Sequence, residues 1–115
     1  MEMIDRPLCY IAGPYTAGDP VENTHNTLRF ADSLHDLGFV TCVVPHISLF
    51  WHVVNPRHYQ HWLDYDLALL KRCDCLFRLP GDSNGADAEV QYAERNNIPV
   101  FTETYSLMEW AKEWS

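Results

Sequence analysis

"CLFRLPGDSNGADAEV", residues 75–90, contains a short apolar run, a turn and the start of a helix. The run 75–79 is typical of a buried strand, because it is short, apolar and bounded by turn residues. After the turn, Ala86, Val90 and Ala93 fall on one face of the expected helix. A strand that passes directly into a helix is the unit from which parallel sheets are built.

The same unit recurs along the chain. Apolar runs bounded by turn residues predict strands at 8–12, 39–45, 75–79 and 98–101. Asp19-Pro20 and Asn55-Pro56 each combine a helix-capping residue with proline at the first helical position. These signals, with a capping box that begins at Ser106, predict helices at 20–37, 56–72, 84–96 and from 106 onward, and a long loop at 46–55.

The alternation predicts one α/β domain spanning residues 1–115. We expect a small doubly wound parallel sheet of the Rossmann or flavodoxin type, with four to five strands in the order 2-1-3-4 and any fifth strand at the edge. Ligands bind such sheets at the carboxyl ends of the strands, where the strand order reverses. The loops 13–19 and 80–86 should meet at that crevice.

Composition limits the possible partners and the cellular setting. A net charge of −8 argues against binding to a nucleic acid polymer. No apolar run reaches the length of a membrane span, and the first residues do not resemble a signal peptide, so a cytoplasmic protein with a small-molecule partner is expected. The four cysteines are interpreted as reduced buried thiols, and neither a metal nor another cofactor is expected.

Asp66 lies in the apolar arc of the second expected helix, beside Tyr59, Trp62 and Leu70. A carboxylate in such an arc must be paired or hydrogen-bonded, because burying it alone is costly. It can be a satisfied core acid or a member of a functional site. The neighbouring Asp64 projects to the opposite, wetter side.

Glu89 lies at the edge of the apolar arc of the third expected helix, while Asp82 and Asp87 project away from it. Its place near the helix start can simply complement the helix dipole. It can also present a carboxylate to the crevice. Two carboxylates from adjacent helices at one crevice suggest glycosyl chemistry, with Glu89 as nucleophile and Asp66 as acid/base group or sugar-hydroxyl anchor.

Four segments together resemble the nucleoside 2-deoxyribosyltransferase-like superfamily, in its small branch with "PH…LWH" and "RLPG.S.GAD.EV" patterns. They are "YIAGPYT", "VVPHISLFWH", "DLALLKRCDCLFRLPGDSNGADAEVQYA" and "IPVF", and the resemblance spans nearly the whole chain, from about residue 8 to residue 101. The resemblance implies cleavage of the N-glycosidic bond of a deoxynucleoside or nucleotide by a Glu nucleophile. It also implies a homo-oligomer, because a neighbouring subunit often completes such sites.

The resemblance carries specific roles onto this chain. It matches Glu89 to the nucleophile and Asp66 to the acid that contacts the sugar or the leaving base. In the first loop it places Tyr15, beside Gly13, against the substrate. Ser83 matches a ligand-holding position, and Ser83 and Asn84 either cap the helix or touch the ligand.

Two departures from the family pattern concern the substrate. The loop "GPYTAGDP" has no basic residue to meet a phosphate, which favours a neutral nucleoside unless Arg57, Arg78 or the amides of the third helix bind the anion. The insertion "PHISLFWH" adds His46 and His52, which can act as acid/base groups or base contacts. It also adds Trp51, which stacks on a nucleobase or packs under the loop.

The sequence therefore predicts an enzyme, a hydrolase or transferase acting on the N-glycosidic bond of a nucleoside or nucleotide. The alternative is a sensor of the same fold that binds a nucleotide-derived ligand without turnover. Release of free base from a deoxynucleoside would distinguish the two.

Overall fold

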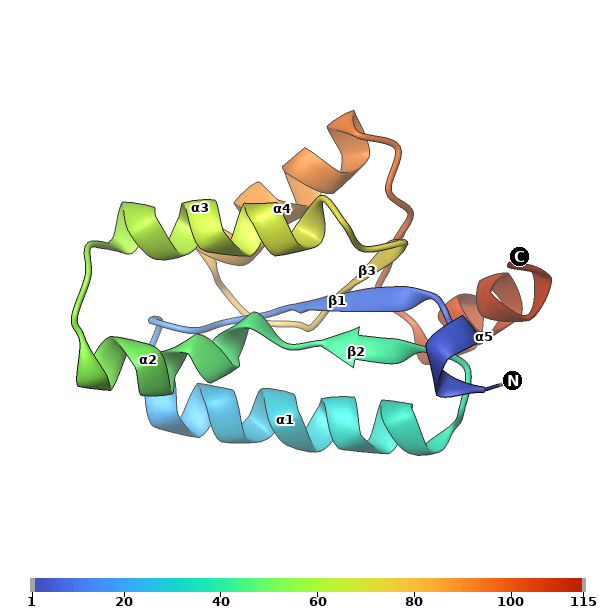
Figure 1. The fold of residues 1–115 in the computed structure, drawn as a ribbon, viewed down its shortest axis with the longest axis horizontal. Helices are drawn as coiled ribbons and strands as arrows, with labels where there is room; N and C mark the ends of the chain where they lie inside the picture. The colour runs from blue at the N-terminus through green and yellow to red at the C-terminus, as the bar shows by residue number, and fades with distance from the viewer. Residues whose placement is uncertain (1, 115) are drawn as a thin grey trace.

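A computed structural model describes residues 2–114 as a parallel four-stranded sheet flanked by helices (Figure 1). Its strands are β1 (Leu8–Ala12), β2 (Thr41–Val43), β3 (Cys75–Arg78) and β4 (Val100–Phe101). Their order across the sheet is β2-β1-β3-β4, and every neighbouring pair is parallel. The predicted fold class and strand order are confirmed, and no fifth strand is present among the described residues.

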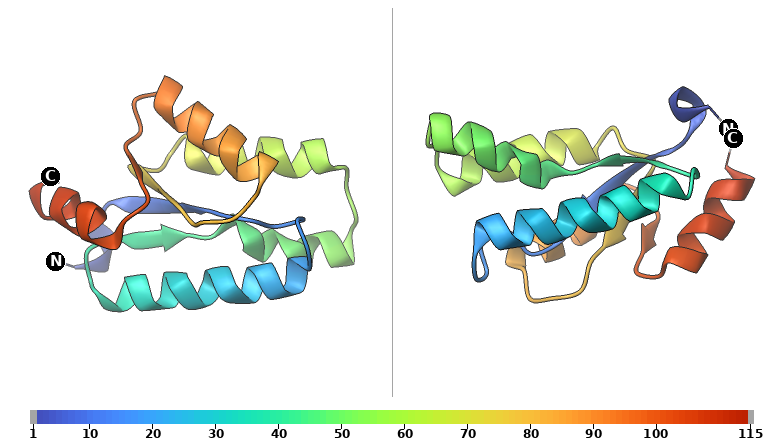
Figure 2. Two further views of the ribbon diagram at one scale, coloured as in Figure 1. Left: turned by 180° about the vertical axis from the view of Figure 1, so that it is seen from behind. Right: turned by 90° about the horizontal axis from the view of Figure 1, so that it is seen from below.

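Helices cover both faces of the sheet (Figure 2). They are α1 (Pro20–Asp36), α2 (Ser48–Val54), α3 (Tyr59–Leu70), α4 (Asn84–Arg95) and α5 (Thr104–Glu113). The side chains of β1 alternate between the two layers, as the period of a strand requires. Cys9 and Ile11 join a core with α1 and α5, whereas Tyr10 and Ala12 join a second core with α3 and α4.

The cysteines belong to these two cores, and all four are free thiols, as expected. Cys9 and Cys75 have no exposed surface. Burial raises the pKa of Cys42 and of Cys73 to about 12, so both remain protonated at neutral pH. Cys42 and Cys73 are therefore packing residues without nucleophilic character.

The first predicted helix start is confirmed. The Asp19 side chain accepts a hydrogen bond from the Val21 amide at 2.9 Å, with Pro20 at the first helical position. At the other end, Gly38 has φ +80°, the left-handed conformation that commonly terminates helices.

Two other helix starts, and one loop, differ from the predictions. The expected loop 46–55 contains α2, and the Asn55 amide donates to Trp51 O at 2.9 Å, so Asn55 ends α2 instead of capping α3. Helix α3 begins only at Tyr59, since His58 is still extended. Helix α5 begins at Thr104, before Ser106, because the Leu107 amide already donates to Glu103 O at 3.2 Å.

The two crevice loops pack tightly against each other at Gly81. This glycine has φ +113°, and a Cβ built on it would lie 2.8 Å from Pro14 Cγ. Only glycine allows both that dihedral angle and that approach. The turn after β3 is therefore held against the loop after β1, which places both loops at the pocket described below.

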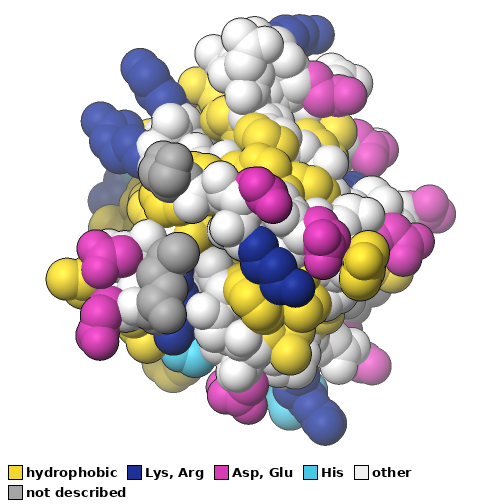
Figure 3. Space-filling view, turned by 90° about the vertical axis from the view of Figure 1, so that its right-hand side faces the viewer, with side chains coloured by type: hydrophobic (Ala, Val, Ile, Leu, Met, Phe, Trp, Pro, Cys, Tyr) yellow, Lys and Arg dark blue, Asp and Glu magenta, His cyan; other side chains and the backbone are white. Residues whose placement is uncertain are grey.

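The end of the molecule at the amino ends of the strands looks different from the crevice. Figure 3 shows acidic and basic side chains interspersed there, with small apolar areas between them. None of the described helices is both long enough and apolar enough to cross a membrane.

Candidate active site

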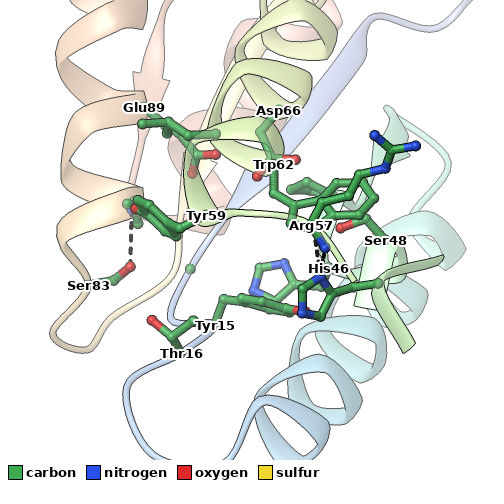
Figure 4. A pocket seen from close by; sticks show the side chains of 16 residues that line it. Tyr15, Thr16, His46, Ser48, Arg57, Tyr59, Trp62, Asp66, Ser83 and Glu89 are labelled. Atoms are coloured by element: carbon green, nitrogen blue, oxygen red, sulfur yellow. Dashed lines mark hydrogen bonds between the residues drawn. The ribbon is translucent and has the colours of Figure 1, made fainter. Parts of the chain in front are cut away.

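A pocket of about 250 Å³ opens at the carboxyl ends of β1 and β3 (Figure 4). Its walls come from the loop after β1, the 45–57 segment, α3 and the start of α4. This is the crevice that the strand order predicts, because the chain leaves β1 and β3 on opposite faces of the sheet.

Glu89 lies in this pocket, on the second turn of α4, with 5% of its surface exposed. Its Oε2 accepts a hydrogen bond from the hydroxyl of Tyr10, which β1 contributes from beneath. Burial raises the pKa of Glu89 to about 7, although the Tyr10 hydrogen bond and the charge of Arg78 act in the opposite direction.

Asp66 lines the same pocket from α3, and Figure 4 shows its carboxyl group directed toward the space in front of Glu89. Burial, and then the charge of Glu89, raise the pKa of Asp66 to about 8. Its Oδ1 is buried and has no hydrogen-bond partner among the described residues. Asp64 is exposed and accepts from Gln60 at 2.8 Å, on the wetter side of α3 as expected.

The pocket therefore contains two carboxyl groups that titrate near neutral pH. The charge of Glu89 raises the pKa of Asp66, so the two groups interact and the pair loses its two protons in separate steps. Between the two ionisation steps the pocket holds one carboxylate and one carboxylic acid, which is the arrangement that acid/base and nucleophilic roles require.

Tyr15 and His46 form another part of the wall. Their rings meet edge to face, with centroids 5.6 Å apart. His46 Nε2 lies 2.9 Å from Pro14 O, which acts only as an acceptor, so the proton is on Nε2. Burial lowers the pKa of His46, and the ring is therefore neutral at physiological pH. His46 Nδ1 is buried without a partner among residues 2–114, so this ring mainly fixes the loop that carries Tyr15.

The start of α4 supplies three small lining residues, Ser83, Gly85 and Ala86. Ser83 Oγ accepts from the Ala86 amide at 3.0 Å and caps the helix. Gly85 lets α4 approach α3, because a Cβ there would lie 3.1 Å from the Tyr59 hydroxyl. Gly13 also lines the pocket, where a Cβ would press on Leu79 at 3.2 Å.

Two predicted substrate contacts lie outside the main pocket. Asn84 borders a neighbouring hollow, together with Asp82 and Tyr59, and is not part of the lining of the main pocket. Trp51 lies on the outer side of α2, packs edge-on against Trp62 and Tyr65, and is 47% exposed. Trp51 is not among the residues that line the main pocket. His52, from the same helix, is the residue that lines the pocket.

Tyr10, which binds Glu89 from beneath the pocket, is a residue that the sequence reasoning missed. It has no exposed surface and occupies the middle of a buried strand, so the pattern identifies it only as core. The signal was its hydroxyl, since a buried phenol needs a hydrogen-bond partner. No group of three or more potential metal ligands gathers anywhere within residues 2–114.

Comparison with known proteins agrees with this architecture. The chain belongs to the family described as "Domain of unknown function (DUF4406)", whose sequence profile matches residues 7–102. Among solved structures, it is similar to a 2-deoxyribosyltransferase from the psychrotolerant bacterium Bacillus psychrosaccharolyticus. That similarity has a TM-score of 0.56 at 17% identity and covers 84% of this chain and 74% of the other.

The resemblance to the nucleoside 2-deoxyribosyltransferase-like superfamily is thus confirmed at the level of the fold. No curated protein matches the chain.

Proposed function

We propose that this protein cleaves or transfers the N-glycosidic bond of a nucleoside or nucleotide, with Glu89 as nucleophile and Asp66 as acid/base group. The observation that carries the proposal is the pair of carboxyl groups in one pocket, with pKa values of about 7 and about 8. The similarity of the fold to a 2-deoxyribosyltransferase supports the same class of reaction.

In the first step, an ionised Glu89 oxygen attacks the anomeric carbon of the sugar. The bond from that carbon to the base nitrogen breaks, and the electron pair leaves with the base. Asp66 donates its proton to the departing base, and the sugar remains attached to Glu89 as an ester. Tyr10 holds Oε2 of Glu89, which leaves Oε1 as the oxygen that attacks.

In the second step, water or a second base attacks the same carbon and releases Glu89 as a carboxylate. Asp66, now ionised, takes the proton from the attacking group, so both carboxyl groups return to their starting states. Which acceptor reaches the ester decides whether the enzyme is a hydrolase or a transferase. Tyr15 and Ser83, which line the pocket, orient the substrate in this scheme.

The proposal includes a homo-oligomer, which the outer face of α2 supports. This short helix turns His52 toward the pocket and exposes large apolar side chains on its other side. The exposed residues of the helix are Phe50, Trp51, Val53 and Val54, and Ile47, just before the helix, is exposed as well. An apolar surface of this kind marks a protein contact. Sedimentation of the wild-type protein and of Phe50→Asp would test this, since the variant should shift toward the monomer.

The decisive experiment incubates the protein separately with each deoxynucleoside and each deoxynucleoside monophosphate and measures free base by chromatography. Release that disappears in Glu89→Gln supports the proposal. Binding without release, seen as a ligand-dependent rise in melting temperature, would instead support the sensor function. Release that persists in Glu89→Gln would refute the nucleophile assignment while leaving the activity intact.

A further inference from the structure

The wall of the pocket away from Glu89 comes from an unusual part of the chain. Residues 37–63 contain no Asp or Glu, although the protein has 16 acidic residues and a net charge of −8. This acid-free segment carries Arg57 and four of the six histidines. The segment has a small net positive charge, whereas the rest of the chain is net negative. Part of the segment lines the pocket.

Arg57 is the only Lys or Arg among the residues that line the pocket. Its side chain is exposed, and within residues 2–114 no carboxylate lies within salt-bridge distance of its guanidinium group. Helix α3 begins two residues later without a side-chain cap, so its partial positive charge adds to that of Arg57. Figure 4 shows Arg57 and Ser48 together on the side of the pocket away from Glu89 and Ser83.

His52 supplies a further donor on this wall. Its Nδ1 accepts from Trp62 Nε1 at 2.8 Å and from the Arg57 amide at 3.2 Å. A ring nitrogen that accepts two hydrogen bonds is not protonated, so Nε2 of the neutral ring carries the proton and acts as a donor. Together with the Ser48 hydroxyl, the wall offers a guanidinium, an imidazole N–H and an O–H to a ligand, and no carboxylate.

The other two candidate anion sites are fully or partly engaged within the protein. Arg78 forms an ion pair with Asp87 at 2.9 Å and also binds the carbonyl groups of Leu79 and Gly81, so it holds the turn after β3. At the start of α4, the Ala86 amide donates to Ser83 Oγ and the Asp87 amide to Ser83 O, both at 3.0 Å, so two of its amides are engaged. A phosphate would therefore gain most from the Arg57 wall.

We propose that the ligand of this pocket is a nucleoside 5′-monophosphate, and that Arg57, assisted by His52 and Ser48, determines this specificity by holding the phosphate. This rests on the proposed function, because it places the anomeric carbon at Glu89 and the 5′-phosphate, which projects beyond the sugar, at the opposite wall. A monophosphate ligand is the opposite of the neutral nucleoside that the first loop, residues 13–19, favours.

The test measures binding in the Glu89→Gln background, so that it does not depend on turnover. Calorimetry compares each deoxynucleoside with its 5′-monophosphate, with and without Arg57→Gln. We expect the best monophosphate to bind at least 10-fold more tightly than its nucleoside. Arg57→Gln should weaken monophosphate binding by about 10- to 100-fold, the size of a charge-assisted contact. It should change nucleoside binding by less than about 3-fold, because the nucleoside has no phosphate to contact Arg57.

Arg29→Gln is the matched control, because it removes the same charge from an exposed position on α1 outside the pocket. It should leave the preference unchanged. Equal binding of nucleoside and monophosphate, equal losses from Arg57→Gln for both, or no binding of either would overturn the inference. If the wild-type protein releases no base but the Arg57-dependent preference is present, the proposed reaction fails and the ligand class stands.

Discussion

Tyr10 and Glu89 are 79 positions apart in the sequence, yet the buried Tyr10 hydroxyl donates to Glu89 Oε2 at the floor of the pocket. The bond joins the central strand of the sheet to the helix that follows β3. It stabilises the charged form of a carboxyl group whose pKa burial would otherwise raise further. This contact therefore couples the core of the fold to the reactivity of the candidate nucleophile.

Glu89→Gln should reduce base release by about 10³-fold or more, because the amide is not a nucleophile. Single-turnover kinetics with the best substrate would measure the loss. Glu94→Gln, an exposed position on the same helix, is the control and should retain wild-type rates. Equal effects of the two substitutions would contradict the nucleophile assignment.

Tyr10→Phe should raise the pKa of Glu89, because it removes the hydrogen bond that favours the carboxylate. The acid limb of the pH–rate profile should move to higher pH, and the rate at pH 7 should fall. The free energy of unfolding should drop by about 1 kcal/mol, as is usual for a lost buried hydrogen bond.

Tyr92→Phe deletes the same atom from a half-buried residue on α4 and provides the comparison for Tyr10→Phe. Its pH–rate profile should match the wild type. An unshifted acid limb in Tyr10→Phe would show that the hydrogen bond does not control Glu89.

The pH dependence of activity should be bell-shaped, rising near the pKa of Glu89, about 7, and falling near that of Asp66, about 8. Asp66→Asn should lower the rate and abolish the basic limb, whereas Asp64→Asn, at an exposed site, should not. Initial rates between pH 5 and 10 would measure both limbs. A basic limb that survives Asp66→Asn would assign it to another group.

Stability should fall as pH rises between about 4 and 8, because both pocket carboxyl groups have pKa values above those of the unfolded chain. Over this range the unfolded state loses protons that the native state retains, so raising the pH favours unfolding. Urea unfolding at several pH values would show the slope. The decline with pH should be smaller in Asp66→Asn than in the wild type, and an unchanged slope in that variant would contradict the raised pKa of Asp66.

Gly81→Ala should destabilise the protein by about 1–3 kcal/mol, since alanine is strained at φ +113° and its Cβ would press on Pro14 at 2.8 Å. Gly18→Ala is a matched control, because Gly18 also has a positive φ but has open space around it. Gly18→Ala should lower the free energy of unfolding by less than Gly81→Ala does. Thermal unfolding of the two variants would separate the strain of the positive φ, which both share, from the clash with Pro14, which only Gly81→Ala has. Equal losses of stability would show that the contact between the loops contributes nothing.

The sequence by itself determined the order of the strands and which acids face the crevice. Apolar runs bounded by turns predicted the strands, and helical projection separated Glu89 from Asp87 and Asp66 from Asp64, because periodicity is a local property. The same logic was wrong at Asn55-Pro56, where a capping signal that is valid locally was overruled by the Asn55 hydrogen bond to α2.

Only the tertiary structure decided the chemistry of the pocket. No local pattern links Tyr10 to Glu89 or makes Asp66 respond to the charge of Glu89, because those interactions join segments brought together by the crossover between β1 and β3. Likewise, the sequence could name Arg57 and Arg78 as possible anion sites. In the folded protein Arg78 forms an ion pair with Asp87, whereas Arg57 lies at the pocket. The sequence could not show this, because pairing and exposure depend on neighbours in three dimensions.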